Sequence, residues 1–412
     1  MNIRGAAAWH LGLCLSCAPA AAQTLPSEPV SFGDGRVTIG GDVSASFGSA
    51  DPGFFNYTDY EYSVLRMLRV DINAAVNATD RLAVLVEVRT ELSLDDVSTA
   101  EIRPYALYLR YCPWTDKDVS VSVGRIPPVF GAFARRSYGG SDNPLIGYPL
   151  GYQYLTTLRP DSLPANADEL LRKRGLGWLD HFSIGNQTPN EGVPLVNAFR
   201  WDTGVAFHAG TDIVKGTAAV TTGTVSNPLF TDDNDGRQFA GRLEVHPVAG
   251  LIVGGSFARG AFPTTPALDA ALAKGARPGD FTQTAWGTDI EYSVGYFLAR
   301  FESIASRWRL PVIDPVAADL PVDAVSTSVE GRYKIVPGLY LAARVDRLTF
   351  SDVVGTTQTL PWDAPVDRVE GGVGFSIQRN LLLKMSLQHN HRDGGPLLQS
   401  ATLGAAQLVF WF

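Results

Sequence analysis

Apolar and polar residues alternate along a series of short segments that together occupy most of the chain. The first five lie at 37–47, 68–76, 82–88, 105–111 and 119–123. A period of two over this length is typical of β-strands with one apolar and one polar face. Eleven further segments bring the expected number of strands to about sixteen. They are centred near Val205, Ala219, Leu243, Val253, Ile290, Phe301, Val329, Leu341, Val373 and Leu383, and the last carries Ala406, Leu408, Phe410 and Phe412.

Short and long connections alternate between these segments. Residues 77–81 form a short connection, 93–101 a longer one, 113–118 a short one and 127–199 a very long one, and the alternation continues to the end of the chain. In an up-and-down meander, this alternation places every long connection at the same end. A soluble sandwich or propeller has no reason to do so, whereas a transmembrane barrel has short periplasmic turns and long extracellular loops.

We therefore expect an all-β fold, a transmembrane antiparallel β-barrel of about sixteen strands formed by residues 36–412. Closure leaves no free edge, which hydrocarbon requires because unpaired backbone groups there cannot bond water. The apolar residues would face lipid and the polar residues the lumen. An exported soluble β-protein, with the same apolar residues packed in a core, remains the alternative.

The first residues are expected to be a targeting segment. Arg4 precedes an apolar stretch at 6–17, and the small residues at 20–22 form a cleavage site, so 1–22 is read as a signal peptide and 23–35 as a periplasmic N-terminal segment. A lipoprotein signal at Cys14 or Cys17 is disfavoured because the residues before each do not fit it. Cleavage leaves Cys112 as the one cysteine, so no disulfide is expected.

Composition excludes several classes. Only 18% of the 412 residues are charged, and the formal net charge is −8. Disordered and coiled-coil chains carry more charge than this. A nucleic-acid binder would carry a basic face, so nucleic acid is not an expected partner.

The predicted inner face is heavily charged at mid-strand. A two-residue loop at 294–295 would pair residues whose numbers sum to 589, which sets Asp289 opposite Arg300. Opposite charges across a ladder stabilise the pairing. A solvated outer face of a soluble sheet would also carry charge. The residues expected on the pore wall are Arg69, Asp71, Glu87, Arg89, Arg242, Glu244, Asp289, Arg300, Glu302, Glu330, Arg344 and Asp346.

Two further hairpins have registers that charge can fix. A three-residue turn at 336–338 would pair residues whose numbers sum to 674, which sets Glu330 opposite Arg344. In the hairpin around Thr79, residue numbers that sum to 158 would set Arg69 opposite Arg89, and two like charges directly opposite destabilise the pairing. We therefore predict a sum of 160, with Asp71 opposite Arg89.

Aromatic residues gather at the two ends of the expected strands. Such bands are typical of the headgroup-level girdles of membrane barrels, although aromatics scattered through a sandwich core would be the alternative. Beside short turns lie Tyr111, Tyr292, Phe297, Tyr333 and Phe412, and near long loops lie Phe47, Trp201, Phe239, Phe257 and Trp286.

The sequence resembles Gram-negative outer-membrane porins. The likeness rests on the signal peptide, the rhythm of strands, and a C-terminal strand that ends on Phe412 and looks like a barrel-assembly signal. Residues 123–131 are similar to the strand end that leads into long loops in phosphate- and substrate-selective porins. The resemblance implies location in the outer membrane, contact with the lipid bilayer and lipopolysaccharide, recognition of Phe412 by the barrel-assembly machinery, and a homotrimer as one oligomeric state.

The connection 127–199 is the third extracellular one, and the resemblance implies that it folds into the barrel and narrows it. A Gly- and Tyr-rich stretch is followed by a short helix with Asn166 as N-cap, Glu169 completing a capping box and Gly175 closing it. A loop of this length is usually functional. It has room for two extra strands near 178–185, which would make an eighteen-stranded barrel. Arg135, Arg136 and Arg159 are its candidate constriction residues.

The expected function is a channel for passive diffusion of small hydrophilic solutes or ions. Guanidinium groups in a narrow pore favour anions. Acidic residues lie two positions from almost every wall arginine, which keeps weak preference and cation preference open. An outer-membrane enzyme and a structural or adhesive barrel are the alternatives.

Motifs for catalysis or cofactors do not emerge from the sequence. It contains no HExxH, no GxSxG and no phosphate-cradling loop, so we predict no enzyme activity and no cofactor. His389 and His391 share a strand face but lack a suitable carboxylate. Thr231, Asp233, Asp235 and Gly236 imitate the start of a calcium loop whose twelfth position is Arg242, where a bidentate Glu is needed. No metal site is predicted.

Overall fold

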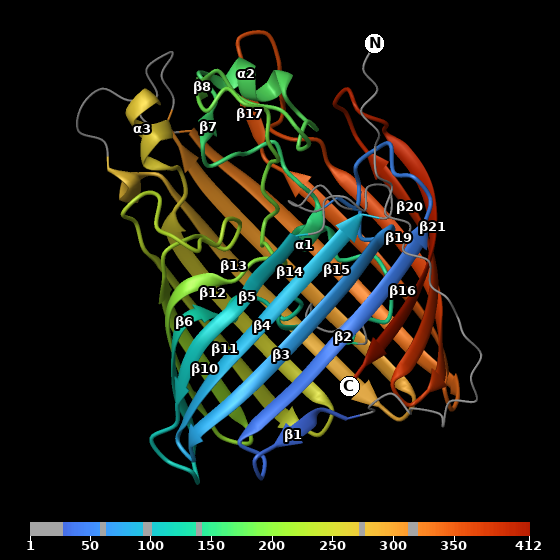
Figure 1. The fold of residues 1–412 in the computed structure, drawn as a ribbon. Coiled ribbons are helices and arrows are strands. Elements are labelled where there is room, and N and C mark those ends of the chain that lie inside the picture. The colour runs from blue at the N-terminus through green and yellow to red at the C-terminus, as the bar shows by residue number, and fades with distance from the viewer. Residues whose placement is uncertain (1–27, 58–62, 94–100, 137–141, 272–276, 312–319) are drawn as a thin grey trace, which may run out of the picture.

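The computed structural model describes residues 28–57, 63–93, 101–136, 142–271, 277–311 and 320–412. Their main sheet has 17 antiparallel strands. The short β1 (Val30–Phe32) pairs with the start of β2, and the other sixteen close into a barrel, as predicted (Figure 1). The predicted signal peptide, 1–22, lies outside the described residues.

Each barrel strand pairs with its neighbours along the chain, and β2 pairs with β21 to close the ring. The barrel strands are β2 (Val37–Gly48), β3 (Met67–Thr79), β4 (Leu82–Ser93), β5 (Glu101–Tyr111), β6 (Asp118–Ile126), β9 (Asp202–Gly210), β10 (Val214–Thr221), β11 (Gln238–Val248), β12 (Leu251–Ala261), β13 (Thr282–Val294), β14 (Phe297–Leu310), β15 (Leu320–Val336), β16 (Leu339–Phe350), β19 (Val366–Gln378), β20 (Leu381–Arg392) and β21 (Ser400–Trp411).

The remaining elements lie in the long connections, which gather at one end of the barrel, while the short turns and the C-terminus lie at the other (Figure 1). The predicted eighteen-strand alternative is wrong, because β7 and β8 have two residues each and pair only with one another. These elements are η2 (Ala134–Arg136), α1 (Leu150–Gln153), β7 (Ser162–Leu163), α2 (Ala167–Arg172), β8 (Ile184–Gly185), α3 (Thr265–Ala271), η4 (Pro278–Asp280), β17 (Asp352–Val354) and β18 (Thr359–Pro361). None of the helices in the described ranges has the length and apolar composition needed to cross a bilayer.

Two of the three registers predicted from charge are confirmed. Asp71 lies opposite Arg89, and Glu330 lies opposite Arg344. The third prediction, Asp289 opposite Arg300, is wrong because the turn lies one residue further along, at 295–296. Gly295 takes a φ of +56° at the first turn position, a conformation that glycine adopts readily, so Val294 stays in the strand.

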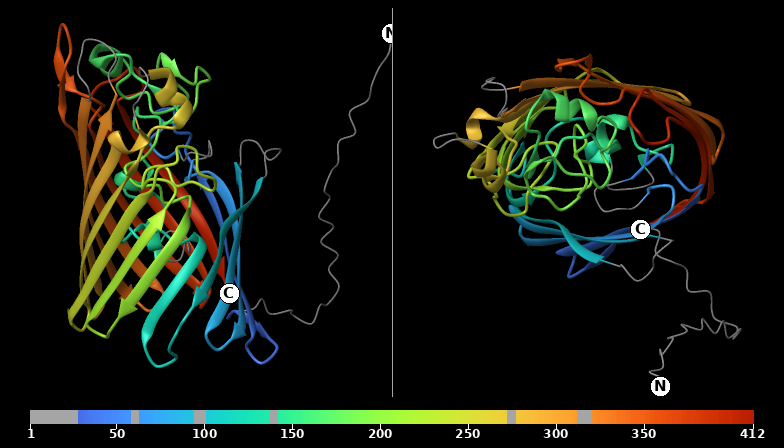
Figure 2. Two further views of the ribbon diagram at one scale, coloured as in Figure 1. Left: turned by 90° about the vertical axis from the view of Figure 1, so that its left-hand side faces the viewer. Right: turned by 90° about the horizontal axis from the view of Figure 1, so that it is seen from above.

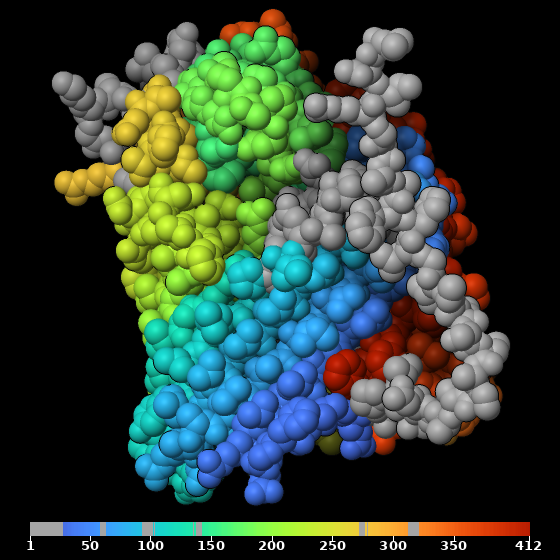
Figure 3. All heavy atoms as spheres, in the orientation of Figure 1, coloured from blue at the N-terminus to red at the C-terminus, as the bar shows by residue number. Residues whose placement is uncertain are grey.

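The outer face of the barrel is apolar, as the period-two pattern predicts. Val329 and Val345 face each other across β15 and β16, and their side chains are 52% and 55% exposed. Side chains on the neighbouring positions point into the lumen and are buried, as Asp71 and Arg344 illustrate. Figure 3 shows that β3 and β4 present a continuous outer surface. The apolar residues therefore surround the barrel rather than packing against a second sheet.

The aromatic bands are present at both ends of the strands, with one exception. Tyr292, Tyr333, Phe239 and Trp286 are exposed on the outer face. Trp201, which the sequence places in the outer band, is instead buried.

Tyr105 also departs from the predicted pattern. The alternation from 105 to 111 predicts that Tyr105 shares the outer face with Leu107 and Leu109. A register shift in the pairing of β4 with β5 leaves Tyr105 as an extra residue between Pro104 and Ala106. Such a bulge reverses the facing of the residues before it. The Tyr105 ring therefore points inward and packs against Trp201, with 5.3 Å between their ring centroids.

A charge on the outer face tests whether that face lies in lipid. We expect Val329→Arg, at mid-strand, to lower the free energy of unfolding from lipid vesicles by about 2–4 kcal/mol, since the guanidinium would enter hydrocarbon. Tyr333→Arg, on the same strand near a short turn, is expected to cost about 0–1 kcal/mol. Guanidinium chloride unfolding in phospholipid vesicles measures both. Equal costs at the two depths would contradict a membrane-facing surface.

Candidate functional site: a lumen narrowed by a long loop

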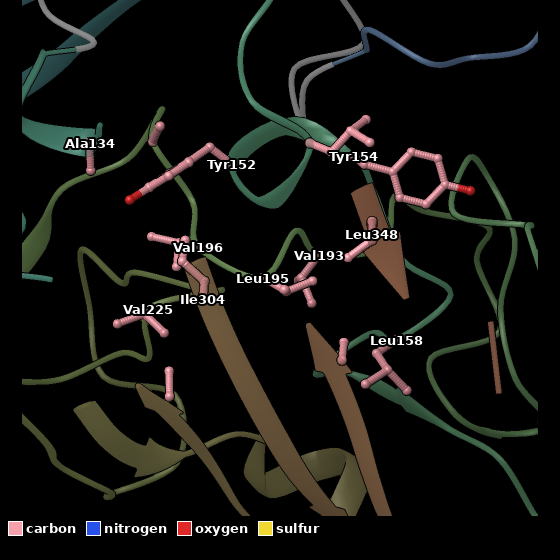
Figure 4. Close-up of a cluster of buried hydrophobic side chains, with 14 of the residues drawn as sticks. Ala134, Tyr152, Tyr154, Leu158, Val193, Leu195, Val196, Val225, Ile304 and Leu348 are labelled. Atoms are coloured by element: carbon pink, nitrogen blue, oxygen red, sulfur yellow. The ribbon is translucent and has the colours of Figure 1, made fainter. Parts of the chain in front are cut away.

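The described residues of the connection between β6 and β9, 127–136 and 142–201, lie within the outline of the barrel when it is seen from above, and β7, α2 and β8 cover its long-loop end (Figure 2). This connection carries its own apolar core. Figure 4 shows Leu158, Val193 and Leu195 of this loop beside Ile304 of β14 and Leu348 of β16. All five side chains are buried in one cluster. Each buried aliphatic side chain of this kind contributes roughly 1.5–3 kcal/mol, so the loop is a packed body within the lumen.

The loop is joined to one side of the wall by a carboxylate. Glu302 accepts a hydrogen bond from the Tyr152 hydroxyl at 2.5 Å and another from the Ala132 backbone N–H at 2.7 Å. The neighbouring Gly131 donates its N–H to the Ser256 hydroxyl at 3.1 Å. Gly131 has a φ of +80°, which positions this N–H and favours glycine. The start of the loop is thereby fixed to β12 and β14.

Arginines hold the opposite side of the loop. Arg368 donates to the carbonyls of Tyr148 at 3.0 Å and Phe55 at 2.7 Å. Arg392 donates to the Tyr154 hydroxyl at 2.8 Å and to the Gly53 carbonyl at 2.8 Å. The first long connection is therefore drawn into the lumen beside the third. Neither Arg368 nor Arg392 is among the residues predicted from the sequence for the pore wall or the constriction.

Further along the loop, the sequence signals for a short helix are confirmed. Asn166 caps α2, and its side chain accepts from the Glu169 N–H at 2.9 Å. The capping box is modified, because the Glu169 carboxylate accepts from Ala165 N–H at 2.7 Å. Gly175, with a φ of +72°, follows the helix as predicted. Its N–H donates to Asp363 of the seventh long connection at 2.6 Å, which ties the two loops together.

The wall charges that the sequence predicts are arranged in ion pairs. On β3 and β4, Asp71 accepts from both Arg69 and Arg89, each at 2.7 Å. Arg89 also approaches Glu91 to 3.8 Å and Glu87 to 3.7 Å. These groups face the lumen, and the guanidinium of Arg89 stacks 3.6 Å above the Tyr105 ring.

A second group of ion pairs crosses β14, β15, β16 and β19. Arg344 contacts Glu370 at 2.7 Å, Asp346 at 3.0 Å and Glu330 at 3.4 Å. Arg300 contacts Glu330 at 3.1 Å as well. Each arginine therefore meets more than one carboxylate, and most of its charge is neutralised locally.

A third group lies on β11 and β13. Arg242 makes a bidentate pair with Asp289, at 2.6 and 2.9 Å, and donates to Glu244 at 2.8 Å. Its remaining contact is with the Ser256 hydroxyl at 3.1 Å. Two parallel bonds of this kind fix the guanidinium in one orientation. The five arginines among the predicted wall residues are therefore each held by neighbouring acids.

A polar cavity of about 400 Å³ lies where the loop meets the second half of the wall. Arg136 and Asp142 of the loop face Arg242, Asp289 and Arg300 across it. Burial lowers the pKa of Arg136, and the nearby Arg300 guanidinium lowers it further. The cavity belongs to the half of the barrel that has the short turns, because β13 and β14 meet just beyond Glu291 and Arg300.

The three predicted constriction arginines have different surroundings. Arg136 lines the cavity. Arg159 is 1% exposed and donates to the backbone carbonyls of Thr157, Asn190 and Leu176. Its guanidinium therefore organises the loop and does not face the cavity, and burial lowers its pKa to about 10. Arg135 lies in η2, and its side chain is outside the described residues.

No group of three or more His, Cys, Asp or Glu side chains within the described ranges is arranged to hold a metal ion. His389 faces outward, and its Nδ1 lies 2.9 Å from the Thr402 hydroxyl. In the stretch that imitates a calcium loop, the Asp232 carboxylate accepts from the N–H groups of Asn234 and Asp235. These hydrogen bonds close a local turn in which the carboxylate binds backbone N–H groups.

Comparison with known proteins finds likeness in structure alone. No protein-family model and no curated protein matches the chain. Among solved structures, the anion-selective porin from Comamonas acidovorans matches with 9% identity and a TM-score of 0.56, over 91% of this chain and 99% of that one. The outer membrane channel DcaP of Acinetobacter baumannii matches with 10% identity and a TM-score of 0.53, over 93% and 100%. A trimer form of OmpT, an outer membrane protein of Vibrio cholerae, matches with 11% identity and a TM-score of 0.51, over 91% and 99%.

The anchoring of the loop can be tested at Arg368. Arg368→Met would leave the buried carbonyls of Tyr148 and Phe55 without these donors, at a cost of about 1–3 kcal/mol each. Arg347→Met is the matched control, since Arg347 is exposed and lies 3.7 Å from Asp367. We expect the control to change the free energy of unfolding by no more than about 0.5 kcal/mol. Guanidinium chloride titrations in detergent measure both, and equal effects would show that Arg368 does not anchor the loop.

Proposed function

We propose that this chain, whose fold is that of outer-membrane porins, is a passive diffusion channel for small hydrophilic solutes in the outer membrane of a Gram-negative bacterium. The observation that carries the proposal is a closed barrel whose third long connection narrows the lumen beside a cavity of about 400 Å³ lined by charged side chains. A polar passage enclosed by an apolar outer face is the arrangement that a water-filled pore in lipid requires.

Weak ion selectivity is the second part of the proposal. The sequence favours anions through its arginines, but Arg242, Arg300 and Arg344 each contact at least two carboxylates. A paired guanidinium presents little net charge to a passing ion. Two charged groups of the cavity lie on the loop, Arg136 and Asp142, and they have opposite signs.

The same proposal names the molecules that would contact the outside of the barrel. The exposed apolar belt and its aromatic bands fit contact with the lipid bilayer, and the loop end of the barrel would then meet lipopolysaccharide. Phe412 lies directly after β21, and its N–H donates to the Gly41 carbonyl at 3.0 Å. We propose it as the group that the barrel-assembly machinery recognises. A homotrimer is the proposed oligomer, by analogy with the trimeric OmpT structure.

Conductance separates this proposal from an outer-membrane enzyme or a structural barrel. In planar bilayers, the purified protein is expected to open discrete steps of conductance. A protein that inserts, as shown by heat-modifiable mobility on gels, but never conducts would refute the channel.

Charge variants at the cavity test the selectivity. In a KCl gradient, the wild-type reversal potential is expected to lie close to zero. Arg136→Gln removes a positive charge and is expected to shift it toward the potassium potential, whereas Asp142→Asn is expected to shift it toward the chloride potential. Arg172→Gln, on the exposed surface of α2, serves as the control. Reversal potentials that stay unchanged in both cavity variants would remove the cavity from the conduction path.

A further inference from the structure

Arg136 lines this cavity, and among the described residues its terminal nitrogens have no hydrogen-bond or ion-pair partner. Arg136 Nε donates to the Ala132 carbonyl at 3.2 Å. Within the described residues, no carboxylate lies within ion-pair distance of its guanidinium. Arg242 and Arg300, which line the same cavity, are each paired. Both terminal NH2 groups of Arg136 are therefore left to bind an anionic group that enters.

Asp142 lines the same cavity and is an anion whose carboxylate likewise lacks a partner among the described residues. Asp142 is exposed, and its backbone carbonyl, rather than its carboxylate, faces the Arg300 guanidinium at 3.5 Å. Among the described residues, neither carboxylate oxygen of Asp142 has a hydrogen bond or an ion pair. The loop thus brings one unpaired charge of each sign to a single space.

Both charges are held by an anchored backbone. The turn before Arg136 is fixed by the hydrogen bonds of Gly131 to Ser256 and of Ala132 to Glu302. Just after Asp142, the Pro144 carbonyl accepts from the Tyr340 hydroxyl at 3.0 Å. A binding site needs this kind of support, because charged groups on a mobile loop lose their geometry.

We propose that this cavity is a weak binding site for small zwitterions of the α-amino acid class, with Arg136 taking the carboxylate and Asp142 the ammonium group. The inference rests on the proposed channel function and names the solute that the channel favours. A simple anion would meet Asp142, Glu244 and Glu291, and a simple cation would meet Arg136, Arg242 and Arg300. A zwitterion satisfies both unpaired groups at once, and 400 Å³ lies within the range of small-molecule sites.

Weak binding in the conduction path favours passage. A solute must bind well enough to enter and leave readily, as in other selective channels. Exposed ion pairs are weak enough to permit this. At low concentration the site raises the local concentration of the zwitterion, and at high concentration its flux saturates.

The test uses two isomers of the same molecular formula, L-alanine, which is a zwitterion, and lactamide, which is neutral. Uptake of each labelled solute into proteoliposomes is measured against protein-free vesicles. With the wild type at low concentration, L-alanine is expected to enter about two to five times faster than lactamide. Its uptake is expected to saturate with concentration, while lactamide uptake stays linear.

Variants identify the residues. Arg136→Gln or Asp142→Asn is expected to bring the ratio of L-alanine to lactamide uptake to about one, with lactamide uptake retained as evidence of an intact channel. Arg172→Gln, on the exposed surface of α2 and not among the residues that line the cavity, is expected to keep the wild-type ratio. The exchanged variant Arg136→Asp with Asp142→Arg is expected to restore the excess, because a zwitterion can bind in the reverse direction.

The outcomes distinguish the two proposals. A wild-type ratio of one, with lactamide entering, would overturn the zwitterion site and leave the channel standing. A wild-type ratio above one that persists in both single variants would also overturn the site. Failure of both solutes to enter would overturn the channel itself.

Discussion

Every backbone N–H and C=O group at the level of the apolar belt has to find a partner inside the protein, because lipid offers none. The pairing of β2 with β21, from Asp42 opposite Trp411 to Gly48 opposite Ala405, meets this requirement by joining the first barrel strand to the last. Without that pairing, two edges would be open. Closure separates an outside that must be apolar from an inside that can be charged, and the remaining features depend on this separation.

The charged inner face has to meet two physical requirements. Its charges must neutralise one another, because single buried charges are costly, and its side chains must provide hydrogen-bond partners for the backbone of the loop that narrows the lumen. Arg344 meets the first requirement by contacting three carboxylates. Arg368 meets the second by donating to carbonyls of two loops. The wall therefore provides hydrogen-bond donors to loop carbonyls that would bind water in a solvent-exposed loop.

The period-two pattern predicted the strands and the facing of most of their side chains, and together with the alternation of short and long connections it predicted the closed barrel. Charge complementarity predicted the registers that set Asp71 opposite Arg89 and Glu330 opposite Arg344. It failed for Asp289 because its turn could be placed one residue earlier with an equally plausible charge pair. It could not have revealed the bulge at Tyr105, which depends on what that ring meets inside the barrel.

The loop was harder to predict than the wall. Its helix followed from local signals at Asn166 and Glu169, which act over a few residues. The position of Arg159 did not, because an arginine in a loop gives no sign of whether it will meet a solute or its own backbone. The contacts of Arg392, on β20, were missed for another reason, since its partners Gly53 and Tyr154 are far away in sequence. Tertiary contacts of this kind have no local signature.

The packed loop has a consequence for the order in which the molecule is completed. Its apolar core includes Ile304, Leu348 and Trp362, which come long after the loop in the chain. Those side chains cannot be supplied until the later strands have been synthesised and brought into the ring. The apolar core of the loop can therefore be completed only after those later strands are in place, although the loop itself comes much earlier in the chain.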